Sequence, residues 1–256
     1  MLKKLTQKEL PAFIHACTYE RVFGSKALTA LRAYGLESET GQFYLCGEPG
    51  EPAAALYLSD GVLVISSNGQ ADVEEIAALI RQKRVGETDT NWPQCAALQG
   101  ILGGVTESSY YMVYAGDPQE HMDPDIRPGV LPDMFRVLQQ SHEYYRTHLK
   151  YEFWAADLER KLNRGLVELY QLELDGKVVG TGSIVSEDDA CGVIGAVAVI
   201  PEYRQRGLGS RVSRFLVGRI QEKGKTPRLI SGYDEVAELY RKIGFVPCGR
   251  WGELYL

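Results

Sequence analysis

The stretch VIPEYRQRGLGSRVSRFL, residues 199–216, passes from an apolar strand pattern into an amphipathic helix. Two arginines and two glycines fall at positions 204–209, where the strand turns into the helix. A helix N-terminus presents unpaired N–H groups and a partial positive charge, and glycine lets an anion approach the backbone closely. The turn is therefore predicted to bind phosphate, with the Arg204 and Arg206 side chains adding charge-assisted contacts.

The distribution of charge supports a specific anionic ligand. Residues 201–228 include eight basic and two acidic side chains, a net charge of +6, whereas residues 106–200 carry a net charge of −8. A basic patch in an acidic protein favours a bound anion, although a solvated helix face is the alternative. The net charge of −6 over all 256 residues argues against a nucleic-acid partner.

Two common phosphate-binding patterns do not fit this turn. A dinucleotide site needs Gly-x-Gly-x-x-Gly, and Val212 occupies the position of the third glycine. A nucleoside-triphosphate loop needs Gly-x-x-x-x-Gly-Lys-Ser/Thr, which the turn also lacks. A different phosphate ligand is expected.

Composition predicts a globular protein of the cytoplasm. Hydrophobic residues make up 45% of the chain and charged residues 24%. The longest nearly uncharged apolar run, residues 190–201, is too short to cross a bilayer, and no signal-peptide pattern opens the chain, so no membrane partner is expected. The five cysteines are scattered and predicted to be buried free thiols: Cys17, Cys46, Cys95, Cys191 and Cys248.

Three prolines and two glycines mark residues 116–129 as a linker, which predicts domains at 1–117 and 118–256. In the first domain we expect a largely helical segment over 8–34, interrupted at Pro11. A hairpin follows, with strands 53–58 and 62–66 around Asp60-Gly61, then a helix over 73–84 and a strand over 110–114. This is a shorter version of the element order expected in the second domain.

The second domain is predicted to begin with two helices, over residues 131–149 and 153–162. Strands at 167–174 and 177–185 flank Asp175-Gly176, and a strand over 193–199 reads as buried on both sides. After the helix that follows Gly207 come a short strand at 229–231, a helix over 234–243 capped by Gly244, and a final strand. The fold class is α/β.

Two motifs in this half resemble those of the GNAT superfamily of N-acetyltransferases. Arg204-Gln205-Arg206-Gly207-Leu208-Gly209 resembles the Arg/Gln-x-x-Gly-x-Gly/Ala signature, and residues 237–245, AELYRKIGF, resemble the second signature, LYxxxGF. The resemblance implies a mixed central sheet flanked by helices over residues 126–256. The first half resembles the smaller, degenerate GNAT-like domain that precedes the catalytic domain in some two-domain members.

The resemblance implies an enzyme that moves an acetyl group from acetyl-CoA (acetyl-coenzyme A) to a small-molecule amine. No metal is expected, because the four histidines include no pair four residues apart and no nearby cysteine cluster. The turn, including Ser210, would hold the pyrophosphate of the coenzyme. The backbone of Val197, Ala198 and Val199 would hydrogen-bond the pantetheine arm, and a backbone N–H of that strand would polarise the thioester carbonyl. Tyr240 would be the general acid that protonates the departing thiolate. The first half would wall the acceptor site or form a homodimer contact.

The sequence departs from the family pattern at two positions and leaves three questions open. Tyr233 and Val236 stand where members often have Asn and Ala. No general base is assigned; the candidates on the acceptor-side helices are His142, Glu143, His148, Glu152 and Asp157. An acyl-enzyme on Cys191 or Cys248 is the rival to direct attack in a ternary complex. A non-catalytic module that senses acyl-CoA is the alternative function.

Overall fold

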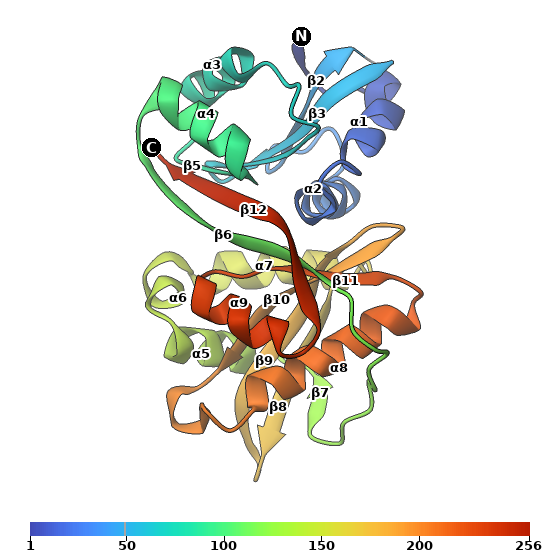
Figure 1. The fold of residues 1–256 in the computed structure, drawn as a ribbon, viewed down its shortest axis with the longest axis vertical. Coiled ribbons are helices and arrows are strands. Elements are labelled where there is room, and N and C mark those ends of the chain that lie inside the picture. The colour runs from blue at the N-terminus through green and yellow to red at the C-terminus, as the bar shows by residue number, and fades with distance from the viewer. Residues whose placement is uncertain (49) are drawn as a thin grey trace. The chain divides into compact units, whose positions relative to one another are not determined.

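The computed structural model describes residues 1–48 and 50–256, which form two compact units. Unit 1 comprises Met1–Met112, Ile230–Ala237 and Pro247–Leu256, and unit 2 comprises Val113–Leu229 and Glu238–Val246. The C-terminal tail thus returns to unit 1 (Figure 1), whereas the predicted domain boundary at 117/118 assigns it to the second domain. The domain boundary at 117/118 therefore stays a prediction.

Unit 1 contains a mixed sheet whose strands are hydrogen-bonded in the order β1-β2-β3-β4-β5-β12-β6. Strands β1 to β4 are antiparallel, β5 is parallel to β4, and β12 is antiparallel to β5. The elements are β1 (Leu2–Lys4), a 3-10 turn (Gln7–Glu9), α1 (Leu10–Ala16), α2 (Arg21–Tyr34), β2 (Gln42–Glu48), β3 (Glu51–Ser59), β4 (Val62–Ser67), α3 (Val73–Lys83), β5 (Glu87–Asn91), α4 (Trp92–Leu102) and β6 (Val105–Tyr114).

Successive side chains of each strand point to opposite faces of the unit 1 sheet, and both faces carry a buried cluster. On β2, Phe43 and Leu45 pack with α1 and α2, whereas Tyr44 and Cys46 pack on the side of α3 and α4. Helices therefore cover both faces, as expected for an α/β fold.

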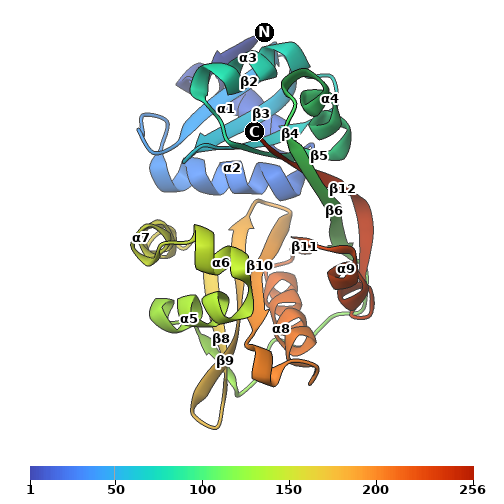
Figure 2. The ribbon, with the colours of Figure 1, turned by 90° about the vertical axis from the view of Figure 1, so that its left-hand side faces the viewer.

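Unit 2 repeats this arrangement with the strand order β7-β8-β9-β10-β11. Figure 2 shows α5 and α6 on one side of β8 to β10 and α8 on the other. The elements of the second half of the chain are β7 (Ile126–Pro128), α5 (Leu131–Ser141), α6 (Glu143–His148), α7 (Tyr151–Leu162), β8 (Glu168–Leu174), β9 (Lys177–Glu187), β10 (Cys191–Val199), a 3-10 turn (Pro201–Tyr203), α8 (Leu208–Glu222), β11 (Thr226–Ile230), α9 (Asp234–Arg241) and β12 (Phe245–Tyr255). Of these, α9 and β12 are divided between the two units.

The two halves of the chain have matching element orders. In each, a first strand and its following helices lead to three further antiparallel strands. A helix, a strand parallel to the fourth, a second helix and a last strand complete the order. The prediction that the first half is a shorter version is wrong, because β1, β2, β5 and α4 were not foreseen. Strand β5 in particular reads ETDTN and has no apolar residue.

Both predicted hairpins are confirmed. Asp60 and Gly61 have φ values of 49° and 79°, and Asp175 and Gly176 have 51° and 74°. Positive φ at both central residues is the two-residue turn whose twist matches the strands it joins.

Two predicted helices break at different places than expected. Pro11 lies in the first turn of α1, where its missing N–H costs nothing, and the chain instead leaves the helix after Ala16. The predicted helix over 131–149 is interrupted at His142, which is extended with φ −151° and ψ 143°.

The helix after Gly207 is held tightly against β9 and β10. A Cβ at Gly182 would lie 2.5 Å from Val212 Cγ1 and 2.8 Å from Leu216 Cδ1, and one at Gly192 would lie 2.8 Å from Ile220 Cγ1. These contacts fix the position of α8, and therefore of the turn at its start. Over the described ranges 1–48 and 50–256, every helix is too short or too polar to cross a lipid bilayer.

Candidate functional site

The predicted phosphate turn has open backbone geometry. Gly207 is the N-cap of α8 with φ 74° and ψ 3°, and Gln205 has φ 60°. No side chain caps the helix among the described residues, and added Cβ atoms at Gly207 and Gly209 would meet nothing within 4 Å. Within the described part of the chain, the first-turn N–H groups are therefore not used by a capping side chain, as an anion site requires.

The corresponding turn of unit 1 is closed by its own side chains. Asp72 is the N-cap of α3, and its Oδ1 accepts hydrogen bonds from the backbone N–H groups of Glu74 and Glu75 at 3.0 and 3.2 Å. A carboxylate thus occupies the donors that would hold a phosphate, and the two glutamates add negative charge. This turn is unsuited to a second coenzyme.

The arginines of the predicted turn have partners elsewhere in unit 2. Arg204 donates from Nε to the Val199 carbonyl at 3.0 Å and from Nη2 to the Ser141 carbonyl. Arg206 donates to the Glu202 carbonyl at 3.2 Å, and its guanidinium lies 5.0 Å from the centre of the Tyr203 ring. Contacts of these two arginines with an anion stay predictions. The geometry that favours an anion here is that of the backbone N–H groups at the start of α8.

Strand β10 is open along its second half. Its parallel pairing with β11 runs from Cys191 to Ile194, and beyond Gly195 its register with β9 shifts by a bulge, where Ala196 has φ 52°. Residues 191–194 are buried, but residues 195–199 are only half-buried. The prediction of a strand buried on both sides is therefore wrong for the segment that contains Val197, Ala198 and Val199.

In unit 1 a carboxylate bridges the equivalent strand ends. Glu20 Oε2 accepts from the side-chain amide of Asn91 on β5 at 3.0 Å and from the backbone N–H of Ser67 on β4 at 3.3 Å. Burial raises the pKa of Glu20, partly offset by these donors. The first half thus fills with its own side chain the position that is open in β10.

Tyr240 is buried on α9 and packs against the ring of Phe245 at 5.6 Å. Burial raises the pKa of its phenol to about 12, and contact with the Ser213 hydroxyl offsets part of that rise. Ser213 in turn donates to the Gly209 carbonyl at 2.8 Å, which links the tyrosine to the first turns of α8. Tyr240 therefore holds its proton at neutral pH, as a general acid must.

Comparison with known proteins identifies this domain. A model of the acetyltransferase (GNAT) family matches residues 131–245, which include the turn, β10 and Tyr240. These residues form a GNAT-family domain. The predicted family and α/β fold class are confirmed, and membership supports transfer of an acyl group from acyl-CoA. No curated protein matches the chain at a significant level.

Solved structures of GNAT proteins share the fold along nearly the whole chain. A GCN5-related N-acetyltransferase from Kribbella flavida has a TM-score of 0.63 and 13% identity, covering 93% of this chain and 95% of that one. One from Sphaerobacter thermophilus has a TM-score of 0.64 and 16% identity, covering 99% and 94%. A tandem GNAT protein from the clavulanic acid biosynthesis pathway has a TM-score of 0.62 and 14% identity, covering 99% of this chain and 97% of that one.

The positions at which the sequence departs from the family pattern are both exposed. Tyr233 is 50% exposed and Val236 is 37% exposed. Neither supplies the amide that an asparagine would at the first position. Gly244, which was predicted to cap a helix ending at Ile243, has φ 109° and donates to the Arg241 carbonyl, but α9 already ends at Arg241.

The described candidate bases of the GNAT domain have exposed or ion-paired side chains. His142, Glu143 and Glu152 are exposed, and Asp157 forms an ion pair with Lys161 at 2.6 Å. The prediction for His148 falls on a side chain outside the described residues. The general base therefore stays unassigned.

The two rival nucleophiles differ in access. Cys191 is fully buried at the start of β10, at the opposite end of the strand from its open half. Cys248 is the exception to the predicted burial of the cysteines: it is exposed, and its thiol contacts the Tyr111 carbonyl at 3.4 Å. The other four cysteines are buried free thiols, as predicted.

A pocket of about 450 Å³ lies beside the turn on the GNAT domain. It is lined by Gly207, Arg211 and Arg214 from α8 and its cap, and by parts of residues 118–123. Arg211 is neutralised there by Asp123 at 2.6 Å and Asp125 at 2.7 Å. Arg214 is exposed and, within the described part of the chain, makes no hydrogen bond or ion pair. Reasoning from sequence missed it, although its spacing of seven residues from Gly207 places both on one face of α8.

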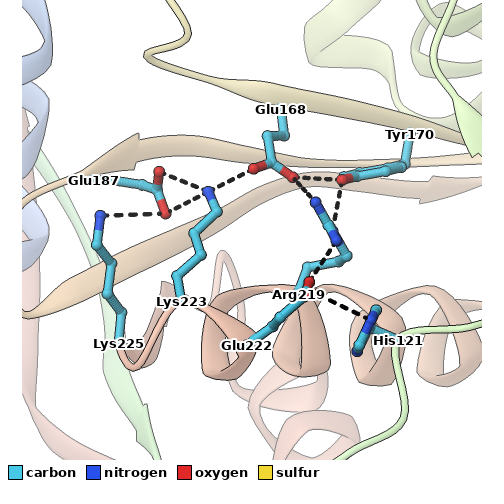
Figure 3. A network of polar contacts seen from close by, with 8 residues as sticks. All are labelled: His121, Glu168, Tyr170, Glu187, Arg219, Glu222, Lys223 and Lys225. Atoms are coloured by element: carbon cyan, nitrogen blue, oxygen red, sulfur yellow. Dashed lines mark hydrogen bonds and ion pairs between the residues drawn. The ribbon is translucent and has the colours of Figure 1, made fainter.

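The far end of α8 is anchored to β8 and β9 by a polar network (Figure 3). Lys223 lies 2.5 Å from Glu168 and 2.8 Å from Glu187, and Arg219 donates to the Tyr170 hydroxyl at 2.9 Å. Although burial acts to raise it, the pKa of Glu168 is lowered by hydrogen bonds from Lys223 and Tyr170. The network holds the helix whose other end forms the turn.

Three carboxylates in unit 1, those of Glu87, Asp89 and Glu253, lie within 4.8 Å of one another. Asp89 is also paired with Lys26 at 3.2 Å. Acidic clusters of this kind are common without an ion, and the prediction that the protein uses no metal stays a prediction.

Proposed function

We propose that the GNAT domain is an N-acetyltransferase that moves an acetyl group from acetyl-CoA to a primary amine of a small molecule or amino acid. The observation that carries the proposal is the uncapped glycine turn of α8, which follows directly from the open half of β10 within the matched family domain.

The donor is expected to lie along these two features. Among the described residues no side chain caps the start of α8, and the backbone N–H groups of its first turn suit a diphosphate. The half-buried backbone of Val197, Ala198 and Val199 offers hydrogen-bonding groups to the amides of a pantetheine arm. Arg214 supplies a positive charge in the adjoining pocket.

In the proposed reaction a neutral amine attacks the thioester carbonyl within a ternary complex. The carbon–nitrogen bond forms, the carbon–sulfur bond breaks, the amine loses a proton to water, and the thiolate accepts a proton from Tyr240. Solvent then reprotonates the phenol. A backbone N–H of β10 would stabilise the charge on the carbonyl oxygen, a contribution worth on the order of 10²- to 10³-fold in rate.

Substitution of Tyr240 tests the role of the acid. Tyr240→Phe is expected to keep CoA affinity and lose roughly 10²-fold or more in turnover, because a positioned acid contributes about 10²- to 10⁴-fold. Turnover is measured as free thiol released from acetyl-CoA during a screen of amines and amino acids. Tyr233→Phe is the matched control, since Tyr233 is exposed and directly precedes α9. Equal turnover by the Tyr240→Phe variant and the parent enzyme would show that Tyr240 is not the general acid.

The alternative is a module that binds acyl-CoA without catalysis, which the replacement of the family's Asn by Tyr233 favours. Thermal stabilisation by CoA without thiol release from any amine in the screen would support this alternative. The cytoplasmic location, the homodimer contact and the absence of a metal also belong to the proposal.

A further inference from the structure

Arg204 opens the phosphate signature, but its side chain faces the acceptor-side helices. Its Nε and Nη2 groups donate to the carbonyls of Val199 and Ser141, and together they form one edge of the planar guanidinium. That edge is one of the two that a bidentate pair with phosphate can use, and it is unavailable while both bonds are present.

The two acceptors mark functionally different places. Val199 is the last residue of β10 and ends its open half. Ser141 is the last residue of α5, where the chain becomes extended at His142 before α6 begins at Glu143. The final carbonyls of a helix lack partners within it, and a cation at that end is favourable. Arg204 thus caps α5 at its break and ties the break to the end of β10.

We propose that Arg204 is a positioning residue for the acceptor side of the reaction and does not pair with the diphosphate. This inference rests on the proposed function, because it gives Arg204 a role in placing the acceptor-side helices against the strand along which the thioester would lie. The backbone amides of the turn remain the phosphate ligands.

An acetyl donor without phosphate distinguishes positioning of the acceptor-side helices from pairing with the diphosphate. Arg204→Gln is tested with acetyl-CoA and with S-acetylpantetheine, which carries the thioester and pantetheine arm but no diphosphate. We expect kcat/KM to fall by roughly tenfold or more with both donors by the same factor, because charge-assisted hydrogen bonds are lost. The KM for the amine should rise, and the Kd for CoA and its salt dependence should match the parent protein.

Two further variants control the experiment. Arg127→Gln removes an exposed arginine on β7 that pairs with Glu173 at 3.4 Å, and it should change kcat/KM by less than about twofold with either acetyl donor. Arg204→Lys keeps the charge with one donor group and should recover part of the activity. CoA binding measured by calorimetry shows that each variant is folded.

A loss confined to acetyl-CoA, with weaker CoA binding and a shallower salt dependence, would overturn the inference, as would unchanged rates with both donors. Amide hydrogen exchange at residues 142–148 gives a readout that needs no turnover: it should accelerate in Arg204→Gln and not in Arg127→Gln. If the parent protein acetylates no amine, the proposed function fails while the exchange experiment still decides the role of Arg204.

Discussion

Glu253 on β12 lies directly opposite Asp89 on β5 in the antiparallel register of the two strands. Burial, Asp89 and the nearby Glu87 raise the pKa of Glu253 to about 8, and the Tyr255 hydroxyl offsets part of this. Lys26 pairs with Asp89 on the same face. The last strand therefore pairs with β5 at a point where two carboxyl groups face each other.

This arrangement predicts a pH-dependent stability. Between the unfolded pKa near 4.5 and the folded pKa of about 8, the folded state binds more protons, so the free energy of unfolding falls as pH rises through this range. Glu253→Gln removes the charge and should raise the free energy of unfolding at pH 8.5 by on the order of 1–2 kcal/mol, with little change at pH 5. Urea denaturation at the two pH values measures this.

Glu51→Gln is the control, because Glu51 is exposed on β3. This variant should show the same change in the free energy of unfolding between pH 5 and 8.5 as the parent protein. A Glu253→Gln variant with the same loss of stability between pH 5 and 8.5 as the parent would contradict the assignment to Glu253.

Gly209→Ala is expected to separate stability from coenzyme binding. Gly209 lies within α8 and its added methyl group would enter open space, so the variant should be more stable by about 0.5–1 kcal/mol. The same methyl group would occupy the approach of a diphosphate, and CoA affinity should fall roughly tenfold. Thermal melting and calorimetry with CoA measure the two effects.

Gly182→Ala provides the opposite case, because its methyl group would collide with Val212 and Leu216. Overpacking here should cost about 1–3 kcal/mol of stability.

Unchanged CoA affinity in Gly209→Ala would show that the ligand does not use the open space beside the turn.

The pH dependence of turnover should reflect the acceptor amine and not Tyr240. Protonated amines do not attack, so kcat/KM should rise with pH until the amine is neutral. Because Tyr240 has a pKa of about 12, it should cause no decline between pH 8 and 10. A decline in this range that disappears in Tyr240→Phe would show that the phenol titrates there.

Binding of CoA should have a stoichiometry of one per chain. The turn of unit 1 is capped by Asp72, and Glu20 bridges the ends of β4 and β5. Calorimetric titration with CoA measures the number of sites, and a value of two would mean that these side chains yield to the ligand.

The sequence predicted local features well because they depend on neighbouring residues. The hairpins at Asp60-Gly61 and Asp175-Gly176, the helix over 73–84 and the glycine turn of α8 all follow from backbone preferences. Strand β5 was missed because Thr88 and Thr90 are its buried residues, and a polar strand shows no hydrophobic alternation.

Features set by contacts distant in sequence could not be predicted. No proline or glycine marks the break at His142, whereas Arg204 contacts the preceding carbonyl from 63 residues away. The open half of β10 was also missed, because its apolar residues resemble those of a buried strand, and its exposure follows from where β11 stops pairing.

Strand β12 has a consequence for how the two halves can be inherited. It begins at Phe245 in unit 2, and its residues from Trp251 to Tyr255 pair with β5 in unit 1. Deleting the gene segment for the first half would leave this tail without its sheet, and splitting the gene near codon 117 would deprive the first half of a strand. Selection can therefore maintain the first half for this strand pairing alone, independently of any coenzyme.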